Sequence, residues 1–223
     1  MPRNHQTKSF VASLTASVCI VVAGCAQHAP ASINPVIKAL IDDIRMFQMW
    51  VYGFENDKRK KALPGDFERA SSTLQCAIVC RDGNGNGVIE GHWDSLSAQD
   101  ESFLLWSHLA AAGQRKAPTS WQSESFSDPY VPKNVLGGRI GITGMREGQQ
   151  PIAGMEGRFV GCTAGIPFAQ VMEIEMLLDD GHPDQGPIRA IPDGASPGAA
   201  AVSAAGNARG NARAGKFTIC FAW

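Results

Sequence analysis

The chain has 223 residues and a formal net charge of −1, with 20 basic and 21 acidic side chains spread along it. This balance leaves no basic stripe, so we expect no nucleic-acid partner. Hydrophobic residues make up 44% of the chain, which suffices for one domain with a core of its own.

The first 24 residues have the order of features that marks an export signal. Arg3 and Lys8 precede an apolar run over residues 10–23, and this run is shorter than the ~20 residues of a membrane-spanning helix. The run ends in Val-Ala-Gly-Cys at residues 22–25, which resembles the lipobox of bacterial lipoproteins. The resemblance implies cleavage before Cys25 and acylation of its sulfur. The alternative is ordinary cleavage nearby, with a free thiol at Cys25.

An acylated Cys25 implies a lipid anchor in the cell envelope, with the remaining chain facing the periplasm or the cell surface. Residues 1–24 would then be the signal peptide, residues 25–33 a short tether, and residues 34–223 a single domain. Ala26 stands where an acidic residue is linked with inner-membrane retention in some lipoproteins, so the outer membrane is favoured.

A long helix is predicted just after the tether. Asn34 can cap a helix, and Pro35 suits its first position. Apolar residues then recur with gaps of three and four residues: Ile37, Leu40, Ile44, Phe47, Val51 and Phe54. This spacing predicts an amphipathic helix of about 20 residues. We expect it to pack on a sheet; a coiled-coil or docking helix is the alternative.

The rest of the chain alternates short helical and strand patterns. Helices are predicted over residues 66–77, 98–112 and 167–178. Strands are predicted at residues 135–136, 139–142, 158–160, 188–191 and 216–223. Residues 195–215 are rich in alanine and glycine and are predicted to form a flexible surface loop. Together these patterns predict an α+β fold.

Apart from Cys19 in the signal and Cys25, the chain has four cysteines: Cys76, Cys80, Cys162 and Cys220. An even number in an exported chain favours two disulfides. Three pairings are possible, and we favour Cys76–Cys80, whose spacing allows a local bridge, together with Cys162–Cys220. A redox or zinc site is the weaker alternative, since three residues rather than two separate the first pair.

The segment 82–87 reads Asp-Gly-Asn-Gly-Asn-Gly, and it follows the start of an EF-hand-type calcium loop. Asp82, Asn84, Asn86 and the Val88 carbonyl fall at the ligand positions, but Trp93 stands where the last carboxylate belongs. Glu90 or Asp94 could substitute for that carboxylate only if the chain wraps differently from an EF-hand loop. The alternative is that the Asp-Gly and Asn-Gly pairs simply form turns. With one certain carboxylate, we expect a weak calcium site with a dissociation constant of ~10⁻⁴ to 10⁻³ M.

No catalytic pattern in the sequence meets its chemical requirements. Residues 194–198 match the Gly-x-Ser-x-Gly motif, but Pro197 follows Ser196 and offers no N–H to an oxyanion. His108 is expected to be a hydrogen-bonded packing residue. Glu173 and Glu175 diverge on a helix and do not form an acid–base pair. We therefore expect a protein that is not an enzyme.

Several segments, in this order, resemble the soluble part of bacterial type IV pilin-like proteins, the prepilin and pseudopilin group. They are the helical pattern at 35–54, Ala-Leu-Pro-Gly-Asp-Phe at 62–67, the segments 82–89 and 101–113, and the stretch 166–190 with its Leu-Asp-Asp-Gly-His-Pro. The resemblance implies a long N-terminal helix packed on an antiparallel sheet, with a loop-rich C-terminal section held by cysteines. It also implies a pilus or secretion-filament subunit or accessory without catalytic residues.

The chain departs from that group at its N-terminus. Prepilins carry a short leader ending in glycine, followed by phenylalanine and a long apolar helix that forms the filament core, whereas this chain has the lipobox-like segment. We therefore expect a lipid-anchored accessory that contacts the membrane and pilus or secretion proteins, and does not polymerise in the usual way. The alternative is a calcium-stabilised extracytoplasmic lipoprotein that binds a ligand at residues 134–165 and has no link to filaments.

Overall fold

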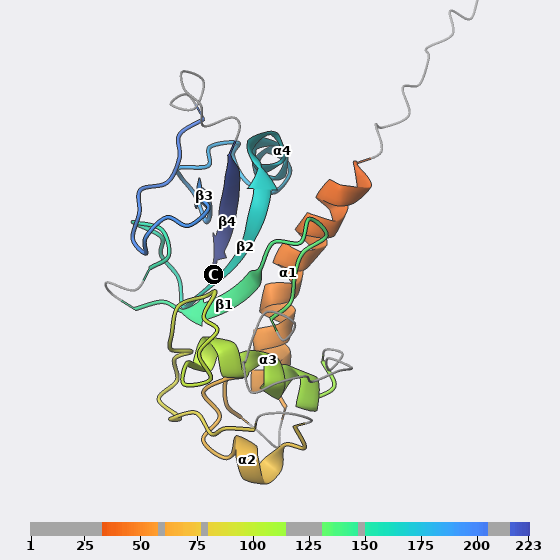
Figure 1. Cartoon of the computed structure of the whole chain (residues 1–223), viewed down its shortest axis with the longest axis vertical. Coiled ribbons are helices and arrows are strands. Elements are labelled where there is room, and N and C mark those ends of the chain that lie inside the picture. Colours follow the sequence, from red (N-terminus) through yellow and green to blue (C-terminus); the bar gives the residue numbers. More distant parts are fainter. Residues whose placement is uncertain (1–32, 58–60, 77–79, 115–130, 147–149, 205–214) are drawn as a thin grey trace, which may run out of the picture. The chain divides into compact units, whose positions relative to one another are not determined.

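The computed structural model describes residues 33–57, 61–76, 80–114, 131–146, 150–204 and 215–223. Over these residues the chain forms helices α1 (Pro35–Glu55), α2 (Ala70–Thr73), α3 (Glu101–Ala111) and α4 (Phe168–Leu178). It also forms strands β1 (Ile140–Gly144), β2 (Phe159–Pro167), β3 (Ile188–Pro192) and β4 (Lys216–Ala222). The helices and the antiparallel sheet confirm the predicted α+β class (Figure 1).

The four strands form one sheet in the order β1-β2-β4-β3, and every neighbouring pair is antiparallel. Strand β4 therefore lies between β2 and β3, although it follows both in the sequence. Cys162 of β2 lies opposite Cys220 of β4, and Ala190 of β3 lies opposite Ile219 of β4. The sheet thus joins segments that are far apart along the chain.

Helix α1 begins where the capping signal places it. The Asn34 side chain accepts a hydrogen bond from Val36 N at 2.9 Å, and Pro35 occupies the first turn, where a missing N–H has no cost. The apolar residues of the predicted repeat are all buried: Ile37, Leu40, Ile44, Phe47, Val51 and Phe54. The helix contacts β2 and α4 (Figure 1). No helix within the described ranges is both long and apolar enough to span a membrane.

A glycine in β2 allows α1 to approach the sheet closely. A Cβ atom on Gly161 would lie 2.2 Å from Cδ2 of Phe47, so no side chain fits at this position. The Phe47 ring also stacks on Trp223, with 6.4 Å between the ring centroids. The missing side chain and the aromatic contact together set the distance between α1 and β2.

The buried side of α1 belongs to the main apolar core on one side of the sheet. The opposite side of the sheet carries a second, smaller apolar cluster, which contains the Cys162–Cys220 disulfide. Because side chains alternate along a strand, Cys162 points away from the face on which Gly161 meets α1. The other members of this cluster are Trp93, Ile152, Met155, Val160, Ile191 and Ala222. A second disulfide joins Cys76 and Cys80. Both predicted pairings are confirmed.

Two predicted helices are shorter than expected. The helix predicted at 66–77 is reduced to the single turn α2. Before this turn, the Asp66 carboxylate accepts hydrogen bonds from main-chain amides of the segment 82–90, and after it Leu74 is already extended. The helix at 98–112 begins only at Glu101. The Ser97 side chain accepts a hydrogen bond from Gln99 N in a turn before the helix.

Two further segments differ from the prediction. Residues 135–136 form no strand, because the Asn134 side chain accepts hydrogen bonds from Leu136 N and Gly138 N and holds a turn. Residues 195–204, predicted as part of a flexible loop, are tied to the domain by hydrogen bonds from Ala153 N to Ala199 O and from Val202 N to Ala190 O. The rest of that loop, 205–214, lies outside the described residues.

Replacing Gly161 by alanine is expected to destabilise the fold by about 1–3 kcal/mol, since the added methyl group overlaps the Phe47 ring. Gly53→Ala is the matched control. Gly53 lies on the exposed side of α1 and faces only the flexible Gln114 side chain, so alanine there should favour the helix by about 0.5–1 kcal/mol. Urea denaturation measures both changes. Wild-type stability in Gly161→Ala would contradict the close packing.

Candidate functional site

The glycine-rich segment 82–90 is held by a buried carboxylate from α3. Glu101 is 5% exposed, and its two oxygens accept hydrogen bonds from Asn84 N at 2.9 Å and from Glu90 N at 3.1 Å. Burial raises the pKa of Glu101, and the two amide hydrogen bonds partly oppose that rise. The segment is therefore fastened to α3 through its main chain.

A second carboxylate, that of Asp66, fastens the tip of the same segment. Its oxygens accept hydrogen bonds from Asn86 N at 2.9 Å and from Gly87 N at 2.8 Å, and the residue is 2% exposed. Burial raises the pKa of Asp66, while the loop amides act in the opposite direction. The buried carboxylates of Asp66 and Glu101 thus both find their partners within the chain.

The predicted calcium ligands lie in this segment, but their side chains have different partners. Asp82 accepts hydrogen bonds from Ser71 N at 2.7 Å and from Ser71 Oγ at 3.0 Å, and these bonds lower the pKa of its carboxyl group. Asn84 and Asn86 donate their side-chain amides to Glu90, at 2.6 and 3.2 Å. The structure therefore brings Asn84, Asn86 and Glu90 together, and it places the Asp82 carboxylate against α2.

Calcium binding at the segment 82–90 stays a prediction. The Asn84 side-chain oxygen accepts a hydrogen bond from Asn86 N, and the Asn86 oxygen accepts one from Val88 N, both at 3.0 Å. Glu90 also forms an ion pair with Arg146 at 2.5 Å. A calcium ion would have to replace these contacts for the predicted oxygens to face it.

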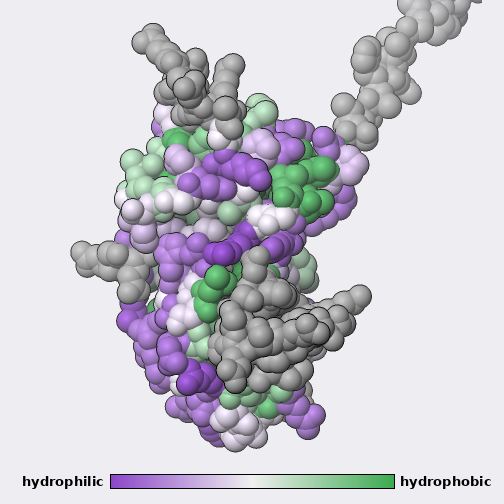
Figure 2. Space-filling model, viewed as in Figure 1, coloured by the Kyte–Doolittle hydropathy of each residue, from purple (hydrophilic) through white to green (hydrophobic). Residues whose placement is uncertain are grey.

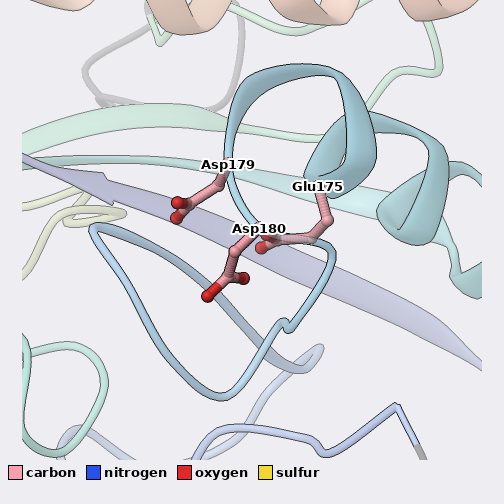
Figure 3. A group of neighbouring side chains, drawn as sticks. All are labelled: Glu175, Asp179 and Asp180. Atoms are coloured by element: carbon pink, nitrogen blue, oxygen red, sulfur yellow. The ribbon is translucent and has the colours of Figure 1, made fainter.

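A different acidic group lies at the C-terminal end of α4 (Figure 3). One carboxylate oxygen from each of Glu175, Asp179 and Asp180 lies within 4.8 Å of the others, and we refer to these three residues as the acidic cluster. Among the described residues this is the one group of acidic, histidine or cysteine side chains that meets this spacing. The acidic cluster could therefore hold a metal ion.

Glu175 is the most unusual member of the acidic cluster, because it is fully buried. Neither of its carboxylate oxygens has a hydrogen-bond partner in the described part of the chain. Burial, together with the charges of Asp179, Asp180 and Asp184, raises the pKa of Glu175 to about 8. No basic residue lies in the last turn of α4 to offset these charges. At neutral pH the cluster therefore either holds a proton on Glu175 or attracts a cation.

The sequence pattern does not predict the acidic cluster. Glu175 is weighed there only as a partner of Glu173, and residues 179–181 mark only the end of a helix. The available signal is the spacing: carboxylates at positions i, i+4 and i+5 at the end of an apolar helix. The burial of Glu175 is set by tertiary packing and leaves no local trace in the sequence.

The other residues considered for chemistry have structural surroundings or lie outside the described ranges. His108 is confirmed as a packing residue: its Nδ1 accepts a hydrogen bond from Gly65 N, and its Nε2 donates to Arg81 O, both at 2.9 Å. Burial lowers the pKa of His108 to about 4, which keeps it neutral. Ser196 is exposed in a turn after β3. Cys25 lies outside the described residues, so its acylation stays a prediction.

Comparison of the chain with protein-family models, with curated proteins and with solved structures found no match. A functional proposal for this chain must therefore use the side-chain contacts described above and the resemblance noted in the sequence. The fold, the disulfides and the acidic cluster are the features that such a proposal has to accommodate.

In the presence of a chelator, the contribution of Glu175 to the free energy of unfolding should fall as the pH rises from about 4.5 to about 8, whereas His108, with its lowered pKa, contributes in the opposite direction below about pH 6.5. The folded chain keeps a proton on Glu175 over this range, whereas the unfolded chain releases it near the ordinary pKa of 4.5. Each pKa unit corresponds to about 1.4 kcal/mol, so the loss is on the order of 3–5 kcal/mol. Urea denaturation at several pH values measures this slope. Glu175→Gln should lack the Glu175 contribution, and the same pH dependence in the wild type and in this variant would contradict the assignment.

Proposed function

We propose that this chain is a non-enzymatic, lipid-anchored, pilin-like domain that serves as a structural or binding accessory of a type IV pilus or type II secretion assembly. The observation that carries the proposal is the packing of α1 on the antiparallel sheet at Phe47 and Gly161. A helix that precedes and covers such a sheet is the arrangement that the resemblance to pilin-like proteins implies. The Cys162–Cys220 disulfide, which joins β2 to β4, supports it further.

The proposed anchor is an acylated Cys25, which makes the membrane one partner of the chain. Two disulfides support an oxidising compartment outside the cytoplasm, where such bonds persist. With Ala26 after the cysteine, the proposed location is the periplasmic or surface face of the cell envelope, with the outer membrane favoured over the inner. The proposal assigns no catalytic residue.

Exposed apolar side chains on α1 support a role in binding. Met49 is 64% exposed and Tyr52 is 38% exposed, and their spacing of three residues places them side by side on the helix. On the face seen in Figure 2, apolar surface is divided into small areas by hydrophilic residues. Contacts through a few side chains, such as these two, fit an accessory better than a filament core.

The anchor is tested by the intact mass of the protein extracted from membranes, measured beside a Cys25→Ser variant. We expect a chain that begins at Cys25 and carries acyl groups, and we expect the variant to lose the acyl mass. A cleaved but unacylated wild-type product would overturn the anchor and would leave a free periplasmic or secreted protein.

The accessory role is tested by co-purification with pilus or secretion proteins. Met49→Glu should lower their recovery several-fold without changing the free energy of unfolding, because the side chain is exposed. Met176→Glu is the matched control, since Met176 is 66% exposed and lies on α4 rather than on α1. Absence of such partners from the wild-type preparation would count against the role. Equal recovery with both variants would count against the α1 surface.

The second candidate function is a calcium-stabilised extracytoplasmic lipoprotein that binds a ligand and has no link to filaments. It is favoured by a surface hollow of about 330 Å³ that includes residues 136–139 of the glycine-rich segment 134–165. Charged side chains of both signs line the hollow, among them Arg139, Asp193 and Lys216. A ligand recovered from this hollow, with no filament protein co-purifying, would favour this function over the first.

A further inference from the structure

We propose that Glu175, Asp179 and Asp180 bind a calcium ion, which ties the end of α4 to the start of β3. This site is separate from the segment 82–90, where the sequence places its candidate calcium ligands. The inference does not depend on the proposed function, because it rests only on the contacts within the acidic cluster.

The first observation is a buried carboxylate without partners. Both oxygens of Glu175 lack a hydrogen-bond partner in the described ranges, and the side chain is fully buried. Buried polar groups in folded proteins are almost always paired, and unpaired ones are costly. Asp66 and Glu101 follow this rule, since each accepts two main-chain amides. The exception at Glu175 points to a positively charged ligand.

The second observation is the set of oxygens that remain free in the acidic cluster. Asp179 Oδ2 accepts a hydrogen bond from Ile188 N at 3.1 Å, and Asp180 Oδ1 accepts one from His182 N at 2.8 Å. Each aspartate keeps one oxygen without a hydrogen bond in the described part of the chain, and Glu175 keeps both. Figure 3 shows Glu175 and Asp180 converging at the end of α4, with Asp179 beside them. These oxygens, completed by water, suit the six to eight ligands of calcium.

The charge around the acidic cluster favours a cation over any neutral ligand. The carbonyl groups at the C-terminus of a helix carry partial negative charge, and acidic residues there are ordinarily unfavourable. Here two aspartates follow the last turn of α4, Asp184 adds its charge from the next loop, and no basic residue lies in that turn. A divalent cation converts this mutual repulsion into attraction.

The chemistry of the donors selects calcium. The cluster offers only carboxylate oxygens, whereas zinc prefers histidine and cysteine ligands. Magnesium demands near-ideal octahedral geometry and keeps most of its water, whereas calcium accepts irregular arrangements with several carboxylates. An exposed Asp180 leaves the ion a route from solvent to the buried Glu175.

The loop after α4 is shaped to hold Asp179 in place. Gly186 has a φ of +66°, and a Cβ atom on it would lie 2.3 Å from Asp179 Oδ2. The same oxygen binds Ile188 N, the first residue of β3. An ion on Asp179 would therefore draw together the end of α4, the loop and the edge strand of the sheet.

Calorimetric and thermal titration of the purified chain tests the site, after the protein has been freed of metal with EGTA and dialysed. We expect calcium to bind with a dissociation constant of ~10⁻⁴ to 10⁻³ M and to raise Tm by about 3–10 °C at ~10 mM calcium. Glu175→Gln should abolish this response while its Tm in EGTA is no lower than that of wild type. Asp180→Asn, at an exposed position, should weaken binding about tenfold or more.

The double variant Asp82→Asn/Glu90→Gln is the matched control, because it removes the charged ligands predicted in the segment 82–90 and leaves the acidic cluster intact. It should respond to calcium as wild type does. The proposal is overturned if wild-type protein shows no response, or if Glu175→Gln and Asp180→Asn respond normally while the control does not. An equal response to magnesium would overturn the choice of calcium.

Discussion

The place of α1 depends on one close contact, in which the ring of Phe47 lies against the backbone of Gly161. Any side chain at that position of β2 would push the helix away from the sheet. The contact sets the depth at which the apolar side of α1 enters the main core, and it brings Phe47 onto Trp223. At this contact α1 covers one face of the sheet, and the Cys162–Cys220 disulfide crosslinks β2 and β4 on the other face.

Buried carboxylates are treated in two ways in this chain. Asp66 and Glu101 are enclosed by main-chain amides of a glycine-rich segment, whose lack of side chains lets the backbone come close: a Cβ on Gly83 would lie 2.3 Å from the carbonyl carbon of Asp66. Within the described ranges Glu175 has no such donors, and it faces further negative charge. The first arrangement is complete within the protein, whereas the second leaves a buried carboxylate that the proposed calcium ion would pair. The sequence pattern instead favours the segment 82–90 as the calcium site.

Features with local causes could be read from the sequence. The cap at Asn34, the apolar repeat of α1 and the Cys76–Cys80 pair each depend on residues that are neighbours in the chain. The errors arise where a side chain binds a distant segment. Asp66 lies outside helix α2, and its carboxylate accepts a hydrogen bond from an amide 20 residues further along the chain. Glu175 is buried by tertiary packing, which the local sequence does not indicate. The sequence indicates the loop at residues 82–87, but it does not predict the contacts of this loop with Ser71 and Glu101.

The central position of β4 has a consequence for the order of folding. Strand β3 pairs with β4 and not with β2, so it has no partner in the sheet until residues 216–222 are available. Before then only the β1–β2 hairpin can form, and Cys162 has no Cys220 to oxidise with. Sheets built from such distant segments form slowly. If the chain is exported as proposed, the Cys162–Cys220 disulfide can close only on the oxidising side of the membrane, where it would crosslink β2 to β4 and stabilise the completed sheet.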